Sequence, residues 1–438
     1  MPVIMLYSVH ARNLLRLRQN VSSSPWLHAS GLLLAILSPL ALAPQWHAGA
    51  AASPINPEKG AFIAGHSRNR TFAGVNDNLY VKAFVVTGKG GSLAMITVDC
   101  IGLLYPQLQE IRQKVRLLLA DPGFDPSRIV VSSTHTHAGP DVVGIWGPDP
   151  GHSGVDPAYI ARLTDTAANL LVRAWINRQP AKADFSVTRH GEGWVENISE
   201  PEELDRSVNT VRFKDRKGRA IATLTNFACH PTFVDAVHDK VSSDYVAGFY
   251  RRMDSAYGGV NMFLQGSIGG WIQPEHEPKT FEQAFFRGRG LADAVQQANY
   301  TAKKLKGRDI SYRSRVFNMP VENPGFRALS AAGVINRKLT DSVETEIAVF
   351  RIGDAVFATH PGETVPAMAL QTKSMMKNKG ARFVLGLSMD AMGYIVKPYF
   401  FDKEKKIPHA EYLCSMSAGR ETGPVVMAVL SQLLSRKL

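Results

Sequence analysis

IVVSSTHTHAGP, residues 129–140, begins as a run of β-branched residues and ends in two histidines and a Gly-Pro pair. The β-branched run predicts a buried strand. Extended backbone points residues i and i+2 to the same side, so we expect His135 and His137 to face one pocket. Imidazole is both a common metal ligand and a general acid or base. One histidine could therefore hold a metal while the other moves a proton, although a hydrogen-bonded pair in a loop remains the alternative.

Helices are predicted on both sides of this strand. Residues 105–119 place an apolar side chain every three or four positions, at Leu108, Ile111, Val115 and Leu118, and a second helix is expected over 159–177. Further strands are expected at 79–86, 92–100, 183–192, 208–215, 220–230, 261–267, 310–321, 345–362 (a hairpin) and 381–390, and further helices at 244–258, 281–302, 365–376 and 424–434. Such mixing predicts an α/β fold of layered mixed sheets flanked by helices, in a single domain.

The N-terminal segment has the layout of a secretory signal peptide. Three arginines precede the apolar run SGLLLAILSPLALA (Ser30–Ala43), and small residues follow it. We therefore predict a signal peptide over 1–52, cleaved near 50–52, and a folded domain over 53–438. An uncleaved membrane anchor is the alternative. The segment predicts export to the periplasm or the exterior.

Charge and cysteine content restrict the partners. The formal charge of +12 becomes +9 when the three arginines of the leader are removed. That surplus suits peripheral contact with an anionic membrane surface, or is simply a solvated basic surface. No nucleic-acid-binding motif is present, and the sequence identifies no protein partner. Three cysteines cannot form a disulfide framework, and Cys100 and Cys229 lie in apolar runs that predict burial.

Three more polar side chains stand where predicted strands end. His230 closes LTNFACH, Glu363 follows the Pro-Gly turn after FATH, and Tyr394 follows Gly393. Two imidazoles, a carboxylate and a phenol suit zinc, which accepts N and O ligands. Each residue has another explanation: His230 could cap its strand, Glu363 could favour a helix start, and Tyr394 could pack in the core.

The order of several motifs resembles the neutral/alkaline, non-lysosomal ceramidase family. The similar segments run in order along most of the chain: GVNDNLYVKAFVV at Gly74–Val86, THTHAGP at Thr134–Pro140, NFACHPT at Asn226–Thr232, SSD at Ser242–Asp244, PGE at Pro361–Glu363, GY at Gly393–Tyr394 and EY at Glu411–Tyr412. The resemblance implies hydrolysis of the N-acyl amide bond of ceramide or a related N-acyl lipid.

The resemblance also implies roles for individual residues. One zinc per chain would be held by His135, His230, Glu363 and Tyr394. His137 would carry the proton from the attacking water to the leaving amine, and the Tyr412 hydroxyl would polarise the carbonyl. Asp244 is expected either to orient a ligand histidine or to pair with Arg251 or Arg252.

Departures from the family pattern concern the substrate. The family's Gln-Ser-Asn-x-Gly-Asp segment corresponds to Gln265–Gly270 here, which lacks the acidic residue. Its Asn-Arg-Ser stretch corresponds to Asn197–Ser199, which lacks the arginine. A histidine that the family has in the opening segment is replaced by Asn76. The chain ends at Leu438, without the C-terminal β-sandwich of full-length ceramidases. Two alternatives therefore remain: a zinc hydrolase for another amide or ester, and an inactive binding homologue.

Overall fold

The apolar strands of the first half pair into one large mixed sheet. The computed structural model describes residues 46–235 and 237–436. In spatial order the sheet contains β11 (Val260–Gln265), β9 (Ala220–Phe227), β8 (Ser207–Lys214), β6 (Gln179–Arg189), β1 (Trp46–Pro54), β3 (Tyr80–Gly88), β4 (Gly91–Val98) and β5 (Ile129–Ser133), with β13 (Lys303–Lys304) paired to β6.

This sheet is curled, so that its two edges approach each other. Strands β11 and β5 are at opposite ends of the strand order, yet β11 contacts both β4 and β5. The pairs β4·β5 and β9·β11 are parallel, whereas β1, β3, β6 and β8 pair antiparallel. The carboxyl ends of β5, β9 and β11 consequently lie near one another, where a site can be built from loops.

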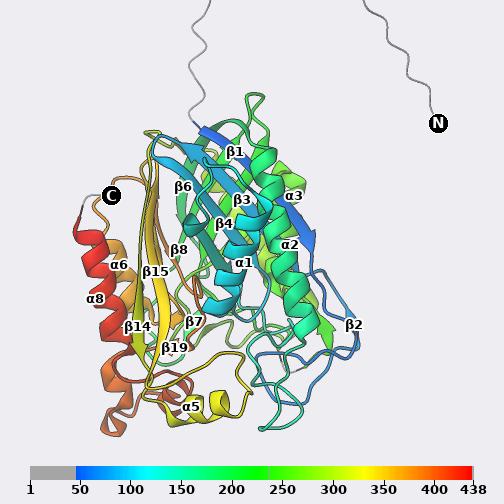
Figure 1. Cartoon of the computed structure of the whole chain (residues 1–438), viewed down its shortest axis with the longest axis vertical. Coiled ribbons are helices and arrows are strands. Elements are labelled where there is room, and N and C mark those ends of the chain that lie inside the picture. The colour runs from blue at the N-terminus through cyan, green and yellow to red at the C-terminus, as the bar shows by residue number, and fades with distance from the viewer. Residues whose placement is uncertain (1–45, 236, 437–438) are drawn as a thin grey trace, which may run out of the picture. The chain divides into compact units, whose positions relative to one another are not determined.

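Helices cover the large sheet. Helices α1 (Tyr105–Leu118) and α2 (Pro157–Ile176) lie in front of β3 and β4 in Figure 1, and α2 contacts β1, β3 and β4. Leu108, Ile111 and Val115 of α1 are buried as their spacing predicts, but Leu118 in its last turn is half exposed. Helices α3 (Tyr245–Tyr257) and α4 (Phe281–Asn299) pack together, α3 against β11 and α4 against β6.

The second half forms a smaller sheet beside the first. Its order is β14 (Ile310–Pro320), β15 (Ser342–Ile352), β16 (Ala355–Thr359) and β18 (Arg382–Leu385), with a parallel β16·β18 pair. Helices α6 (Pro366–Met375) and α8 (Thr422–Ser435) cover its outer side (Figure 1). The contacts β18·β9 and β14·β4 join the two sheets. The predicted layered α/β architecture is confirmed.

Short elements complete the chain. Three two-stranded pairs combine β2 (Gly74–Val75) with β10 (Lys240–Val241), β7 (Glu196–Asn197) with β12 (Ile272–Gln273), and β17 (Glu363–Thr364) with β19 (Tyr394–Ile395). The remaining helical turns are α5 (Pro324–Ala331), α7 (Ala410–Ser415), η1 (Pro126–Arg128), η2 (Pro398–Phe401) and η3 (Lys403–Lys405). Among the helices that the structure describes, none has the length and hydropathy needed to cross a bilayer.

The predicted cleavage region at residues 50–52 falls inside strand β1. Strand β1 begins at Trp46 and pairs with both β3 and β6, and the Trp46 side chain is fully buried. Cleavage near residue 51 would cut an interior strand, so any cleavage that preserves the sheet lies before Trp46. The apolar run at 30–43, on which the signal-peptide prediction rests, lies outside the described residues, and that prediction stays a prediction.

Candidate metal centre

Four chain segments bring the predicted site residues together at strand ends. His135 follows β5, His230 follows β9, and Glu363 follows β16. The parallel pair β17·β19 sets Glu363 directly opposite Tyr394. Because these strands belong to two packed sheets, residues more than two hundred positions apart meet at one point.

The two neighbouring histidines meet, but not through extended backbone. Strand β5 ends at Ser133, and His135 has a left-handed backbone with φ of 69°. Its amide donates to the Cys100 carbonyl at 2.9 Å, and the Nε2 atoms of His135 and His137 are 3.3 Å apart. The prediction of a shared pocket is therefore confirmed, although its stated cause was wrong. Such strained backbone is common at functional sites.

Backbone carbonyls fix the tautomers of two histidines. His135 Nδ1 is 2.6 Å from the Ile101 carbonyl, and His230 Nδ1 is 2.7 Å from the Ile272 carbonyl. A carbonyl only accepts, so each Nδ1 carries the proton and each Nε2 presents a lone pair. Both lone pairs face the same carboxylate, with Glu363 Oε2 at 3.5 Å from His135 Nε2 and 3.1 Å from His230 Nε2.

This donor set fits a bound cation. Lone pairs and a carboxylate repel one another unless a proton or a metal ion lies between them. Zinc binds histidine nitrogen at about 2.0–2.1 Å, which places tetrahedral ligand atoms roughly 3.3 Å apart. The separations of Glu363 from His135 and from His230 are of that size, and the Nε2 or Nδ1 ligand atoms of His135, His137 and His230 lie within 4.8 Å of one another. This buried group could hold a metal ion.

Burial and charge favour the protonation states that metal binding needs. Burial lowers the pKa of His230, which favours the neutral ring. Burial alone would raise the pKa of Glu363, but the His135 and His230 rings outweigh it when they carry a proton at Nε2, and they then hold that pKa well below its usual range. Burial and the neighbouring Glu363 carboxylate raise the pKa of Tyr394 well above its usual value. The phenol therefore stays protonated in the absence of a cation.

His137 differs from the other two histidines in its partner. Its Nδ1 is 3.2 Å from Oδ2 of Asp235, and its amide donates to the Pro231 carbonyl at 3.3 Å. Gly65 packs against the ring: with φ of 110°, it leaves no room for a Cβ, which would stand 2.5 Å from His137 Cγ. Asp235 and Gly65 were missed by the sequence interpretation, because a carboxylate in a loop and a glycine before His66 carry no distinctive local pattern.

Gln265 connects the two histidine loops. Its Nε2 donates to the carbonyls of Thr134 at 2.8 Å and Cys229 at 3.0 Å, the residues immediately before His135 and His230. Its Oε1 accepts from the Cys229 amide at 3.4 Å. The side chain is fully buried at the end of β11. Gln265 was noted in the sequence only as part of an altered motif, and the structure gives it a positioning role.

Tyr412 stands at the edge of the site. Its ring centroid is 6.1 Å from that of Tyr394 and 5.2 Å from that of Trp271, and the residue is 43% exposed. Burial of the hydroxyl and the Glu363 charge raise the pKa of Tyr412 to about 12. The phenol is thus a hydrogen-bond donor at neutral pH. Its predicted catalytic role, like the roles of His137 and the four ligands, stays a prediction.

Both predictions for Asp244 are wrong. Its carboxylate accepts from the amides of Val234 at 3.0 Å and Tyr245 at 2.6 Å, at the start of α3. Arg252 instead pairs with Asp293. Burial raises the pKa of Asp244 to about 7. The residue holds the loop after His230 in place through Val234 and touches no histidine among its described partners.

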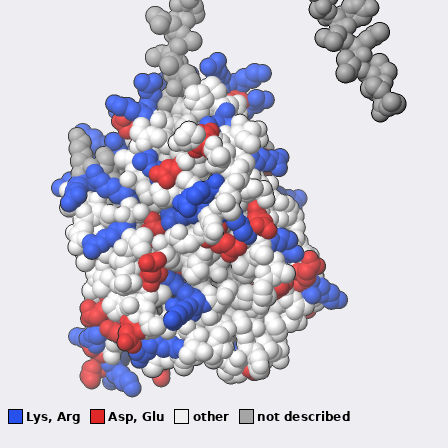
Figure 2. Space-filling view, in the orientation of Figure 1, with Lys and Arg blue, Asp and Glu red and all other residues white. Residues whose placement is uncertain are grey.

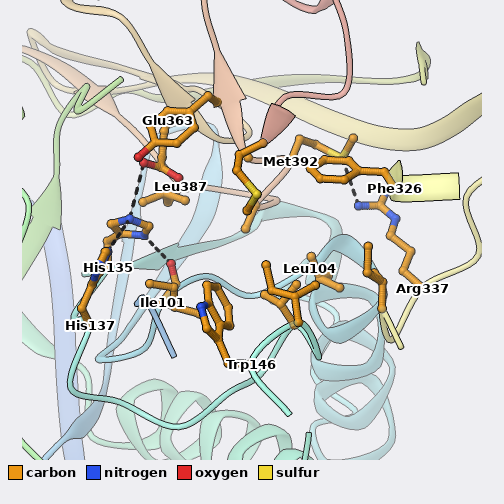
Figure 3. A pocket seen from close by; sticks show the side chains of 18 of the residues that line it. Ile101, Leu104, His135, His137, Trp146, Phe326, Arg337, Glu363, Leu387 and Met392 are labelled. Carbon is orange, nitrogen blue, oxygen red and sulfur yellow. Dashed lines mark hydrogen bonds and ion pairs between the residues drawn. The ribbon is translucent and has the colours of Figure 1, made fainter. Parts of the chain in front are cut away.

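An apolar pocket opens from the histidine cluster. Figure 3 shows His135, His137 and Glu363 at one end and Arg337 at the other, with apolar side chains between them. Arg337 Nη1 lies 2.8 Å from both carboxylate oxygens of Asp390, so its charge is compensated. The apolar lining includes Ile101, Leu104, Trp146, Phe326, Leu387 and Met392. Such a pocket suits an alkyl chain whose polar end reaches the histidines.

The surface charge is mixed on the face that Figure 2 shows. Lysines and arginines are interspersed with aspartates and glutamates there. The excess of basic residues is therefore not gathered into one patch on this face. The predicted contact with an anionic membrane surface remains a prediction.

Comparisons with known proteins point to one family. No family model matches the chain. Neutral ceramidase A and neutral ceramidase B of Dictyostelium discoideum are 22% identical over 191 residues and 25% identical over 193 residues, in each case 39% of this chain. The matched segment spans 26% of the length of each relative.

Solved structures match over far more of the chain. A crystal structure of neutral ceramidase from Pseudomonas aeruginosa superposes with a TM-score of 0.73 at 15% identity, covering 90% of this chain and 74% of that chain. A structure of ceramidase complexed with C2 gives a TM-score of 0.72 at 14% identity, covering 90% and 75%. The chain has the neutral ceramidase fold, and the sequence and structure matches together support the neutral ceramidase family.

Proposed function

Starting from the neutral ceramidase family, we propose that this protein is a zinc-dependent amidohydrolase that cleaves the N-acyl bond of ceramide or a related N-acyl lipid. The observation that carries the proposal is the meeting of His135, His230 and Glu363 beside an apolar pocket, which His135 and Glu363 line. The lone pairs supply the ligands, and the pocket supplies a place for the acyl chain.

The metal would be held by His135, His230 and Glu363, with the Tyr394 phenol as the fourth protein ligand. Zinc in such a site acts as a Lewis acid and lowers the pKa of a water from 15.7 to about 7. The carbonyls of Ile101 and Ile272 hold the two ligand imidazoles in the required tautomer.

His137 is placed to move the proton. Its Nε2 faces the cluster while Asp235 holds Nδ1–H, so the ring accepts a proton at Nε2 and Asp235 stabilises the resulting imidazolium. The oxygen of the attacking water, whose proton His137 takes, bonds to the acyl carbon; as the C–N bond breaks, His137 gives that proton to the nitrogen of the leaving amine. Tyr412, protonated at neutral pH, donates to the carbonyl oxygen as negative charge develops there.

The proposal is tested by chelation and reconstitution. The purified protein is assayed on a panel of N-acyl compounds before treatment with a chelator, after it, and after addition of zinc. We expect hydrolysis to disappear on chelation and return with zinc. Turnover that survives complete metal removal would contradict the proposal, and zinc binding without turnover on any compound would favour a binding protein.

A further inference from the structure

The apolar pocket ends at a buried ion pair. Figure 3 shows Arg337 at the end of the pocket that lies opposite His135 and Glu363. The Arg337 side chain is 5% exposed and the Asp390 side chain is 0% exposed. Beside the histidine cluster, by contrast, the lining residue Tyr412 is 43% exposed. A chain that enters beside the histidines therefore meets a buried guanidinium at the far end.

Arg337 is held in place by several segments of the chain. Its Nη1 lies 2.8 Å from both carboxylate oxygens of Asp390, and its Nη2 donates to the Glu344 carbonyl. The Asp390 oxygens also accept from the Tyr105 amide at 3.0 Å and from the Thr345 hydroxyl at 2.7 Å. Moving the guanidinium aside would leave a buried carboxylate without its cation, which is strongly destabilising. A bound chain therefore cannot push Arg337 away.

The pocket between the two ends favours methylene groups. Its wall includes the side chains of Leu104, Phe326 and Met392. Each methylene that leaves water for such a wall strengthens binding by about fourfold. A methylene added after the chain has reached Arg337 finds no further apolar wall, so the gain stops there.

We propose that the ion pair of Arg337 and Asp390 is the end wall of the acyl pocket and sets an upper limit on the length of the acyl chain. This inference rests on the proposed amidase function and narrows its substrate class. The preferred substrates are N-acyl compounds whose saturated chain fits between the histidine cluster and Arg337.

The first test is a series of acyl lengths. The amides share one amine, the one cleaved fastest in the activity assay, and carry saturated chains from butanoyl to hexadecanoyl in two-carbon steps. They are assayed below the concentrations at which they aggregate. We expect kcat/KM to rise about fourfold for each methylene up to one chain length and not beyond it. A rise that continues to hexadecanoyl, or no dependence on acyl length, would overturn this inference and leave the amidase proposal intact.

A double variant removes the end wall without leaving an unpaired carboxylate. In Arg337→Ala with Asp390→Asn, the new amide oxygen can accept from the Tyr105 amide, and its nitrogen can donate to the Thr345 hydroxyl. We expect the limit to move to longer chains by at least one two-carbon step. The first amide beyond the wild-type limit should then gain about tenfold in kcat/KM relative to the amide at that limit. An unchanged limit in the folded double variant would contradict the assignment.

Two further variants complete this comparison. Arg327→Ala with Asp341→Asn is the matched control, because it removes an arginine–aspartate pair of α5 and its neighbourhood, and neither residue is among the described residues that line the pocket. It should keep the wild-type limit. Arg337→Lys keeps a cation beside Asp390 on a shorter side chain, so it remains informative if the double variant does not fold. We expect it to move the limit in the same direction by a smaller amount, and no movement would count against the end wall.

A binding measurement does not depend on turnover or on zinc. Trp146 lines the apolar pocket, so its fluorescence reports a chain bound there. Linear primary alcohols, which carry no charge toward Glu363, are titrated into metal-free protein, with Trp146→Phe as the blank. We expect Kd to fall about fourfold for each methylene up to a limit, and that limit to lengthen in the Arg337 variants. If no amide is cleaved, the amidase proposal fails, and this series alone decides whether Arg337 closes the pocket. The same limit in wild type and variants would overturn the inference.

Discussion

The strand-end cluster and the rim of the apolar pocket are built in different ways. His135, His230 and Gln265 are buried, and each is tied to backbone groups of other segments. At the rim, α5 has no fully buried residue and α7 has only Leu413. The proposed reacting groups therefore belong to the buried core, whereas the part of the pocket wall that α5 and α7 contribute stands on short, mostly exposed elements.

We expect the largest loss of hydrolytic activity from a substitution in the histidine cluster. His230→Ala removes one proposed ligand and the contact of 3.1 Å that its Nε2 makes with the Glu363 carboxylate. We expect hydrolysis to fall by more than the roughly 10–100-fold that loss of an outer partner costs, together with loss of bound zinc. Zinc content and initial rates check this, with His152→Ala, whose side chain is 74% exposed, as the control. Full zinc occupancy in His230→Ala would remove it from the ligand set.

The next largest loss of activity is expected at His137, and the variant shows whether this residue carries a proton or is a third histidine ligand. His137→Ala should lower kcat by about 10²–10⁴-fold while zinc remains bound, because His137 is the proposed proton carrier and is not one of the four proposed ligands. Metal analysis and steady-state kinetics of the same sample make the measurement. Loss of the metal in this variant would instead make His137 a ligand with His135 and His230.

We expect a smaller effect, a loss of zinc affinity, at Gln265, which joins the loops that carry His135 and His230. Gln265→Leu keeps the volume but removes the bonds to Thr134 and Cys229. We expect zinc affinity to weaken by about 10–100-fold, the usual cost of losing an outer-shell partner. Competition with a chromophoric chelator measures it. An affinity equal to that of the wild type would show that the histidine loops hold their positions without this bridge.

We expect a smaller loss of activity from a substitution at the rim of the apolar pocket. Phe326→Ala in α5 removes part of the apolar wall and no cluster contact. We expect KM for a dodecanoyl amide to rise roughly tenfold with little change in kcat, and the zinc content to stay the same. A matched set of acyl lengths tests this. A large fall in kcat would show that the rim and the cluster are not separate.

The smallest effect on the site is expected at a histidine of the supporting core. His360 Nδ1 and Nε2 contact the hydroxyls of Thr364 and Thr372, and burial lowers its pKa to about 3. The unfolded state binds this proton near pH 6.5, so stability is lost as pH falls below that value. Between about pH 7 and 5 we expect the wild type to lose about 2 kcal/mol more than His360→Asn. Urea unfolding at both pH values measures it, and parallel losses would contradict the assignment.

Much of the fold could be predicted because hydrophobic periodicity survives in single segments. The strand at 129–133, the helix over 105–118 and the hairpin around Gly353 follow their patterns closely. Strand β1 was missed because WHAGAAASP has no β-branched residue and follows an apolar leader-like segment. Its place is set by pairing with β3 and β6, which no local pattern encodes.

The residues of the site also fall into two groups, those that the sequence could predict and those that it could not. His135, His137, His230 and Glu363 end apolar strands and could be found from that position. Asp235 and Gln265 act through contacts between loops, so only the tertiary structure reveals them. Asp244 shows the converse, since a motif acid beside the site supports the loop after His230 and not a histidine.

Whether the cluster holds one zinc ion can be measured directly. The direct measurement is calorimetric titration of zinc into metal-free wild-type protein and into a His135→Ala, His230→Ala double variant that circular dichroism shows to be folded. If the cluster binds zinc as proposed, the wild type has one tight site per chain and the variant has none. Equal binding by both proteins, or no tight binding by the wild type, would contradict it.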